Sequence, residues 1–170
     1  YMMTKKLIFA FWVIILTFTT ARADTPSLRQ LFIEMPDSII PYLSHNNRLD
    51  LLDFMDSNMK SEVTNDFGGK SVMTVLTEDS ISVQLNELNK AKILLLESTL
   101  PVDSSNCVIA LIRTIYIDGE QVETDLKYYS VKWRKLTEEP QLSPAHKELM
   151  KRYVKPSNII NFLIRRVNKD

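Results

Sequence analysis

The sequence predicts an α+β fold in which short N-terminal helices pack on an antiparallel β-meander of about five strands, followed by a C-terminal helix. Three observations support this prediction. Apolar residues recur at helical spacing up to residue 66, alternate with polar ones from residue 71, and return to helical spacing after residue 143. We expect one domain over 24–170, with a helical part at 26–66, a sheet part at 71–136 and a C-terminal part at 143–167.

The first 23 residues have the pattern of a signal peptide. Residues 5–6 are lysines, residues 7–20 are uncharged and mostly apolar, and residues 21–23 read Ala-Arg-Ala. The apolar run is shorter than the roughly 20 residues that span a bilayer. We therefore expect cleavage between Ala23 and Asp24, no stable membrane anchor afterwards, and a periplasmic or secreted protein.

The charge balance argues against a nucleic-acid partner. The chain has 21 basic and 21 acidic residues, and loss of Lys5, Lys6 and Arg22 with the signal peptide leaves a net charge of about −3. Binding to phosphate backbones requires a basic stripe instead. We therefore expect no nucleic-acid binding.

Two short helices are expected before residue 44. The first begins near Ser27 and ends at Pro36. Its apolar face is formed by residues at helical spacing, namely Leu28, Leu31, Phe32 and Met35. The second is a very short helix within 37–43, capped by Asp37 or Ser38.

A longer amphipathic helix follows, capped by Asn46 or Asn47 and extending to about Asn65. Its apolar face is formed by Leu51, Leu52, Met55 and Met59. Gly68 and Gly69 then turn the chain into the sheet. We expect a positive φ at Gly69, so that Gly69→Val would cost about 1–3 kcal/mol.

The sheet part contains segments with the alternation or the apolar density typical of strands. They are residues 71–77, 81–85, 91–97, 107–117 and 122–133. The pair Asp118-Gly119 between two of them is a strong hairpin signal. Because the connections are short, we expect each strand to pair with its neighbour in sequence.

The C-terminal part begins with a helix opened by Ser143 and Pro144, which contains Leu149, Met150 and Tyr153. Residues 159–167 form either a final helix or a last strand. The sequence leaves both alternatives open.

Residues 35–85 also carry a family resemblance. The segment MPDSIIPYLSHNNRLDLLDFMDSNMKSEVTNDFGGKSVMTVLTEDSISVQL resembles the signature of a family of exported Bacteroidales proteins catalogued as a domain of unknown function. The resemblance extends over most of the chain after residue 23. It implies a signal peptide and a non-cytoplasmic location, and it implies no activity and no catalytic residues.

The same resemblance implies a possible modification. Some exported proteins of this bacterial group carry O-glycans at Asp followed by Ser or Thr and an aliphatic residue. Two sites fit this pattern, at Ser38 and at Ser80. We expect Ser80 to be the better site because a hairpin tip is hard to bury, although Asp-Ser also suits a plain cap or turn.

No motif indicates a cofactor or a metal. The run Gly68-Gly69-Lys70-Ser71 ends like a phosphate-binding loop, but Thr64 stands where that loop needs glycine. Cys107 lies among apolar residues, which predicts a buried, inert thiol. We therefore expect neither a nucleotide site nor a reactive cysteine.

The acidic and histidine residues give only general signals. Asp50, Asp53 and Asp56 share a helix face, which is more typical of a solvated surface than of a cation site. His45 could act as a general base with Asp50, but a surface or capping histidine is more usual. We expect no bound metal.

Aromatic residues give the candidate binding site. Tyr129 and Trp133 share one face of a strand and Tyr128 lies on the other. Such rings stack on sugars or peptides, and they also pack cores. We take Tyr128, Tyr129 and Trp133 as candidate binding residues, with core packing as the alternative.

Two classes of function follow. The first is a non-catalytic binding module that holds a peptide, a glycan or a partner protein on an exposed sheet face or edge. The second is a hydrolase that uses a carboxylate and a histidine for acid–base chemistry. The absence of a Gly-x-Ser-x-Gly pattern or a similar motif favours the binding module.

Overall fold

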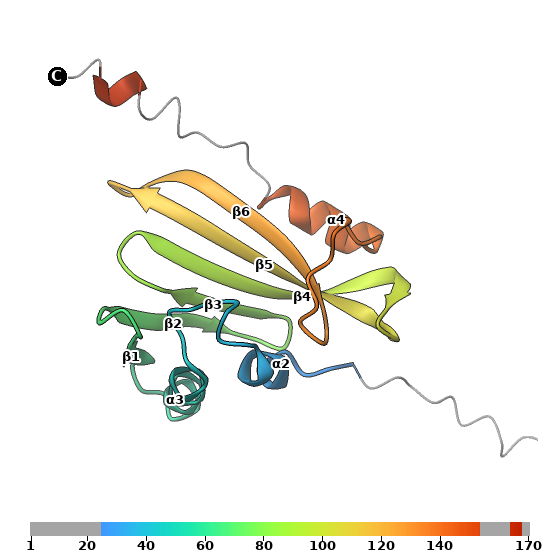
Figure 1. Ribbon diagram of the computed structural model, residues 1–170, viewed down its shortest axis with the longest axis horizontal. Coiled ribbons are helices and arrows are strands. Elements are labelled where there is room, and N and C mark those ends of the chain that lie inside the picture. The colour runs from blue at the N-terminus through green and yellow to red at the C-terminus, as the bar shows by residue number, and fades with distance from the viewer. Residues whose placement is uncertain (1–24, 154–163, 168–170) are drawn as a thin grey trace, which may run out of the picture.

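A six-stranded antiparallel sheet with helices on both faces forms the protein (Figure 1). The computed structural model describes residues 25–153 and 164–167 of the chain. The predicted α+β fold with a C-terminal helix is confirmed, with six strands in place of about five. The expected signal peptide at 1–23 lies outside the described residues, as does 159–163, whereas 164–167 are helical. None of the described helices is long and apolar enough to cross a membrane.

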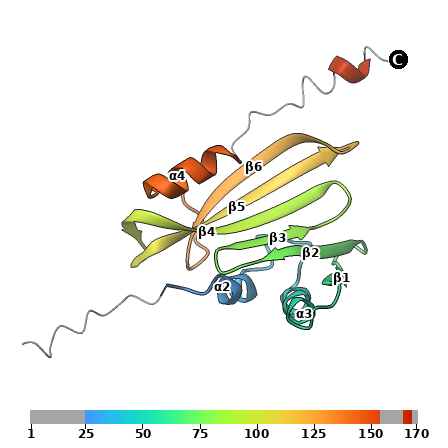
Figure 2. The same ribbon diagram turned by 180° about the vertical axis from the view of Figure 1, so that it is seen from behind.

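Every strand pairs with its neighbours in sequence, in the order β1-β2-β3-β4-β5-β6. The strands are β1 Glu62–Thr64, β2 Lys70–Leu76, β3 Ser80–Gln84, β4 Asn89–Val102, β5 Ser105–Ile117 and β6 Glu120–Ser130. All pairs are antiparallel, so the expected meander is confirmed. β4 and β5 are the longest strands, with 14 and 13 residues, and their shared hairpin extends beyond the rest of the sheet (Figure 2).

The two long hairpins close through residues with positive φ. Asp118 and Gly119 have φ values of 52° and 79°, which suit a two-residue turn whose twist matches the flanking strands. The predicted hairpin is confirmed at this position. Asp103 and Ser104 connect β4 to β5 in the same way, with φ values of 49° and 67°.

The N-terminal helices begin at serine caps. α2, Leu28–Glu34, starts at Ser27, whose hydroxyl accepts a hydrogen bond from the backbone N–H of Gln30. α3, His45–Asp56, starts at Ser44, which forms a reciprocal capping box with Asn47. The expected caps Asn46 and Asn47 were therefore wrong by two or three residues. The expected short helix within 37–43 is a series of turns.

α3 ends at Asp56 rather than near Asn65 because Asn58 takes a positive φ of 51° and the chain leaves the helix. The following residues form the edge strand β1, which the sequence did not predict. Asn65 then organises the turn into β2: its side-chain oxygen accepts hydrogen bonds from the N–H groups of Phe67 and Gly69. Gly68 has the positive φ, 80°, so the expectation for Gly69 was wrong.

The sheet separates two apolar clusters, one on each face. The α2/α3 face is the side on which α2 and α3 pack, and the α4 face is the side that carries α4, Pro144–Lys151 (Figures 1 and 2). β4 contributes to both because its side chains alternate: Ile93 faces α2 and α3, whereas Leu94 and Leu96 face α4.

Arg48 is a charged residue buried within the α2/α3 cluster, with only 1% of its surface exposed. Its guanidinium donates to the backbone oxygens of Leu43 at 2.6 Å and Met35 at 2.5 Å, and to the carboxylate of Asp37 at 2.8 Å. The side chain therefore fixes the turns between α2 and α3. Burial of a guanidinium is tolerated here because carbonyl oxygens surround it.

Candidate functional site

The α4 face is only partly covered by its helix. Near α4 the strands present apolar side chains, but further along they present polar ones. The register aligns these polar residues in rows across the sheet. Ser82 lies opposite Lys92 and Gln84 opposite Lys90, and Lys90 in turn lies opposite Thr114 on β5.

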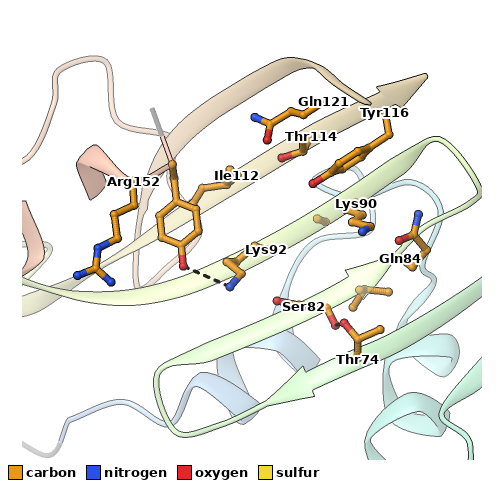
Figure 3. A pocket seen from close by; sticks show the side chains of 13 residues that line it. Thr74, Ser82, Gln84, Lys90, Lys92, Ile112, Thr114, Tyr116, Gln121 and Arg152 are labelled. Carbon is orange, nitrogen blue, oxygen red and sulfur yellow. Dashed lines mark hydrogen bonds between the residues drawn. The ribbon is translucent and has the colours of Figure 1, made fainter. Parts of the chain in front are cut away.

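These rows form an open pocket with a volume of about 330 Å³ (Figure 3). Its lining comes from β2 to β5, the start of β6 and the end of α4: Thr74, Ser82, Val83, Gln84, Lys90, Ala91, Lys92, Ile112, Thr114, Tyr116, Gln121, Arg152 and Tyr153. Arg152 and Tyr116 lie at opposite ends of it (Figure 3). We call this site the sheet pocket.

Three cationic side chains line the sheet pocket, Lys90, Lys92 and Arg152, and its lining contains no aspartate or glutamate. Within residues 25–153 and 164–167, none of the three forms a salt bridge. Tyrosine rings position the lysines instead. Lys90 Nζ lies 4.6 Å from the ring centre of Tyr116, and Lys92 Nζ lies 5.1 Å from that of Tyr153.

Lys92 also donates a hydrogen bond of 3.3 Å to the hydroxyl of Tyr153 (Figure 3). An ammonium group has three donors, so this contact leaves two for a ligand. Ser82 adds a buried hydroxyl that has no hydrogen-bond partner among the described residues. The pocket therefore offers both positive charge and hydrogen-bonding groups.

The position of α4 determines one end of the sheet pocket. His146 Nδ1 accepts a hydrogen bond of 2.8 Å from the backbone N–H of Glu97 on β4, and the N–H of Ser143 donates to the oxygen of Glu97 at 3.0 Å. Leu142 forms a bridge with Ser98. These contacts fix the start of α4 on the sheet, so its last turn delivers Arg152 to the pocket.

The aromatic residues expected to bind a ligand are buried. Tyr128 packs in the α4 cluster, whereas Tyr129 and Trp133 pack in the α2/α3 cluster with ring centres 5.6 Å apart. Burial, with the charge of Glu139 nearby, raises the pKa of Tyr128 to about 12, and burial also raises the pKa of Tyr129. The three rings pack in the core, which was the alternative to ligand binding. They therefore form no exposed aromatic row.

The expected polar candidates lie apart from one another. Asp50, Asp53 and Asp56 are exposed on α3, and Asp56 pairs with Arg29. His45 is exposed, with Nδ1 3.2 Å from the backbone oxygen of Ile33. In the part of the chain that the structure describes, no group of three or more His, Cys, Asp or Glu residues is arranged to hold a metal ion.

Cys107 is half-buried on β5 and not fully buried as expected. Burial raises the pKa of its thiol, which keeps the group protonated at neutral pH. A protonated thiol is a poor nucleophile.

The two candidate glycosylation sites differ in exposure. Ser38 is exposed in the turns after α2, next to Asp37, whose carboxylate accepts a hydrogen bond from Arg48. Ser80 is half-buried as the first residue of β3, and its backbone N–H donates to the hydroxyl of Thr77. Exposure thus favours Ser38, the reverse of the expected order.

Sequence reasoning missed the sheet pocket and Arg48. The alternation of polar residues at 82–84 and 90–92 was visible, but it indicates exposure without showing which strands lie side by side. Arg152 carries no local signal because only the packing of α4 brings it to the sheet. Helical spacing places Arg48 in line with Leu51 and Leu52 on the apolar face of α3, but its charge is typical of a surface residue, so its burial was not predicted.

Comparisons with known proteins give a family and a similar fold. The family described as "Protein of unknown function (DUF3256)" matches residues 20–166. The chain is similar to the structure of a domain of an uncharacterized protein from Porphyromonas gingivalis W83, with a TM-score of 0.52 and 17% identity over 76% of this chain and 71% of that one. At this identity the likeness concerns the fold alone. A search of curated proteins finds no match. The expected resemblance to a Bacteroidales family of unknown function is confirmed.

Proposed function

The chain belongs to the DUF3256 family of proteins of unknown function, and we propose that it is an exported, non-catalytic module that binds a glycan in the sheet pocket. The sheet pocket itself carries this proposal. Its volume of about 330 Å³ lies at the lower end of the range of ligand pockets, about 300–1,000 Å³. A small sugar is a ligand of suitable size.

The chemistry of the lining favours a glycan over a peptide. Thr74, Ser82 and Thr114 supply hydroxyl groups, and Gln84 and Gln121 supply amide groups. Sugar hydroxyls both donate and accept hydrogen bonds, as these groups do. A bound peptide would instead use a sheet edge or an apolar groove.

The lining also favours binding over hydrolysis. The alternative function expected from the sequence is a hydrolase that uses a carboxylate and a histidine as acid and base. The lining of the sheet pocket contains neither residue type. His146 lies on α4, where its Nδ1 already accepts a hydrogen bond from the backbone of Glu97.

Export is part of the proposal and rests on the sequence. The lysines at 5–6, the apolar run at 7–20 and the small residues before Asp24 support a cleaved signal peptide and a periplasmic or secreted protein. Mass spectrometry of the protein from its native source should find an N-terminus at Asp24. Retention of residues before Leu7 would contradict export by this route.

Glycosylation of Ser38 or Ser80 is a further expectation that depends on export. Ser38 should carry more of any glycan because it is the more exposed of the two. Intact mass of the natively exported protein tests this directly. A mass equal to that of the bare 24–170 chain would exclude the modification.

A saccharide screen tests the binding function. Ligand-observed NMR would compare neutral and acidic saccharides with short peptides. We expect saccharides to bind the protein and the control variant Thr64→Trp, which changes an exposed threonine on β1. Thr114→Trp should abolish binding because the ring fills the sheet pocket. The proposed function is wrong if no saccharide binds, or if Thr114→Trp binds as well as the control.

A further inference from the structure

We infer that the glycan bound in the sheet pocket is acidic: a small sugar whose carboxylate or phosphate group is held by Lys92 and Arg152. This inference rests on the proposed function and specifies the class of its ligand. It comes from the distribution of charge over the sheet, from the environment of the lysines and from the size of the pocket.

The positive charge of the sheet pocket is a local concentration. The chain as a whole has 21 basic and 21 acidic residues, yet the lining contains three cations and no acid. Lys90 and Lys92 are two positions apart on β4, so their Cα atoms lie about 7 Å from each other on the same face. Like charges held this close raise the local potential and favour an anion.

Two acidic residues of β6 lie on the other face of the sheet. Glu123 pairs with Ile115 and Asp125 pairs with Arg113. These two β5 residues flank Thr114, whose side chain lines the pocket. Because side chains alternate along a strand, these carboxylates lie on the α2/α3 side and cannot neutralise the lysines by direct contact. Arg152 interacts electrostatically with Glu148 on α4, which pairs with Lys151. An anionic group from outside the chain would supply a counter-charge to the two lysines.

The cations also have the geometry of an anion site. Tyr153 orients Lys92 through its hydroxyl and its ring, which reduces the entropy lost when the ammonium binds a ligand. Arg152, at the same end of the pocket, has a planar guanidinium that binds a carboxylate or a phosphate with two parallel hydrogen bonds. We therefore place the anionic group of the ligand at this end of the pocket, which both Lys92 and Arg152 line.

The rest of the pocket suits a sugar ring attached to that group. Thr114 and Gln121 line the end away from Arg152, where they supply a hydroxyl and an amide group. A volume of about 330 Å³ holds a small ligand and excludes a long polymer lying wholly within the pocket. The ligand is thus a small acidic saccharide or the acidic end of a longer one.

Calorimetric titration of matched sugar pairs tests the inference. The pairs are glucuronic acid and glucose, galacturonic acid and galactose, and glucose 6-phosphate and glucose; inorganic phosphate is titrated alone. At least one acidic sugar should bind about tenfold or more tightly than its neutral parent. Higher salt should lower the affinity for the acidic sugar and leave the affinity for the neutral sugar unchanged. The pair that shows the preference also identifies the anion as carboxylate or phosphate.

Charge variants locate the effect. Lys92→Met and Arg152→Met should each reduce the affinity for the acidic sugar about tenfold, while Lys92→Arg should preserve the preference. Lys135→Met is the matched control: it removes the same charge from an exposed position outside the pocket and should change nothing. Circular dichroism of each variant checks that the fold is intact.

The outcomes separate this inference from the proposed function. Equal affinity for acidic and neutral sugars overturns the inference and leaves a neutral glycan in the same pocket. An acid preference that survives both methionine variants also overturns it, because Lys92 and Arg152 then do not hold the anionic group. Binding of inorganic phosphate with no acidic sugar preferred over its parent also overturns it. If no saccharide binds in the broader screen, the proposed function fails as well.

Discussion

The two faces of the sheet are built from the same strands but differ in what covers them. On the α2/α3 face, the buried apolar residues continue across the sheet, from Met73 on β2 to Leu111 on β5. On the α4 face they stop part of the way, and polar residues continue. The comparison shows that a single strand can be core along one side and polar surface along part of the other.

β4 shows the change most directly. Its residues toward α2 and α3 are apolar from Ala91 to Leu95, whereas those on the α4 face change from Lys90 and Lys92 to Leu94. The change marks the limit of the surface covered by α4. Beyond it, polar residues avoid the cost of exposing apolar surface to water.

Truncation on the α2/α3 face should have the largest effect on stability. Phe32 is fully buried, and Phe32→Ala removes its ring and leaves a cavity, which should lower the free energy of unfolding by about 3–5 kcal/mol. Urea unfolding measures the loss. Thr114→Ala in the sheet pocket should cost less than about 1 kcal/mol. Similar losses for both would mean that the two faces contribute equally to stability.

Replacement of the buried Arg48 should cause the next largest loss of stability. Arg48→Met keeps most of the side-chain volume but leaves the backbone oxygens of Leu43 and Met35 without a donor, which should cost about 2–4 kcal/mol. The control Asp37→Asn should cost less than about 1 kcal/mol because Asp37 is largely exposed. Equal losses in chemical denaturation would assign the effect to the ion pair instead.

Substitution of the two glycines in the turn between β1 and β2 should affect stability differently. Gly68 has a φ of 80°, so Gly68→Ala should cost about 1–2 kcal/mol of backbone strain. Gly69 lacks a positive φ, and an added Cβ would lie 3.4 Å from Nδ2 of Asn65. Gly69→Ala should therefore change the melting temperature little. A larger loss at Gly69 would show that the Asn65 contact cannot adjust.

On the α4 face, His146→Ala should loosen α4 without unfolding the sheet. It removes one hydrogen-bond acceptor from the backbone of Glu97, which is worth about 1 kcal/mol. Hydrogen exchange should become faster in α4 and at the Glu97 amide, while α2 stays protected. Equally faster exchange in α2 would show that the two faces unfold together.

Substitution of Tyr128 should cause the smallest change in stability. Its buried hydroxyl has no hydrogen-bond partner among the described residues, so Tyr128→Phe should change stability by less than about 0.5 kcal/mol. The pKa of Tyr128 is raised from 10.0 to about 12 in the folded protein. The neutral phenol therefore favours folding below pH 10.0, and this contribution is lost as the pH rises toward about 12. The wild type should lose more stability than the phenylalanine variant over this range.

Local chemistry explains what the sequence could predict. Asp118-Gly119 specifies a hairpin by itself, because both residues tolerate the positive φ that the turn requires. Ser143 and Pro144 correctly placed the start of α4. In each case the decisive residues are adjacent in the chain.

Most features that the sequence did not predict depend on residues that are distant in the chain. The end of α3 had only a weak marker in the sequence, because Asn58 tolerates a positive φ but no glycine or proline lies between Asp56 and Glu62. β1 has only 3 residues and exists because β2 pairs with it. The sheet pocket combines residues from separate strands and from the end of α4, which only the sheet order and helix packing bring together.

The order of the strands also determines how the chain can fold. Each β-hairpin joins neighbours in sequence, so the sheet can form by closing a series of short loops, which is entropically inexpensive and fast. In contrast to the hairpin contacts, the hydrogen bond that Nε1 of Trp133 donates to the oxygen of Leu31 joins residues 102 positions apart. This bond joins α2 to the loop after β6 and cannot form until both ends of the chain meet. The buried indole of Trp133 is thus a built-in fluorescent reporter of the closing step of folding.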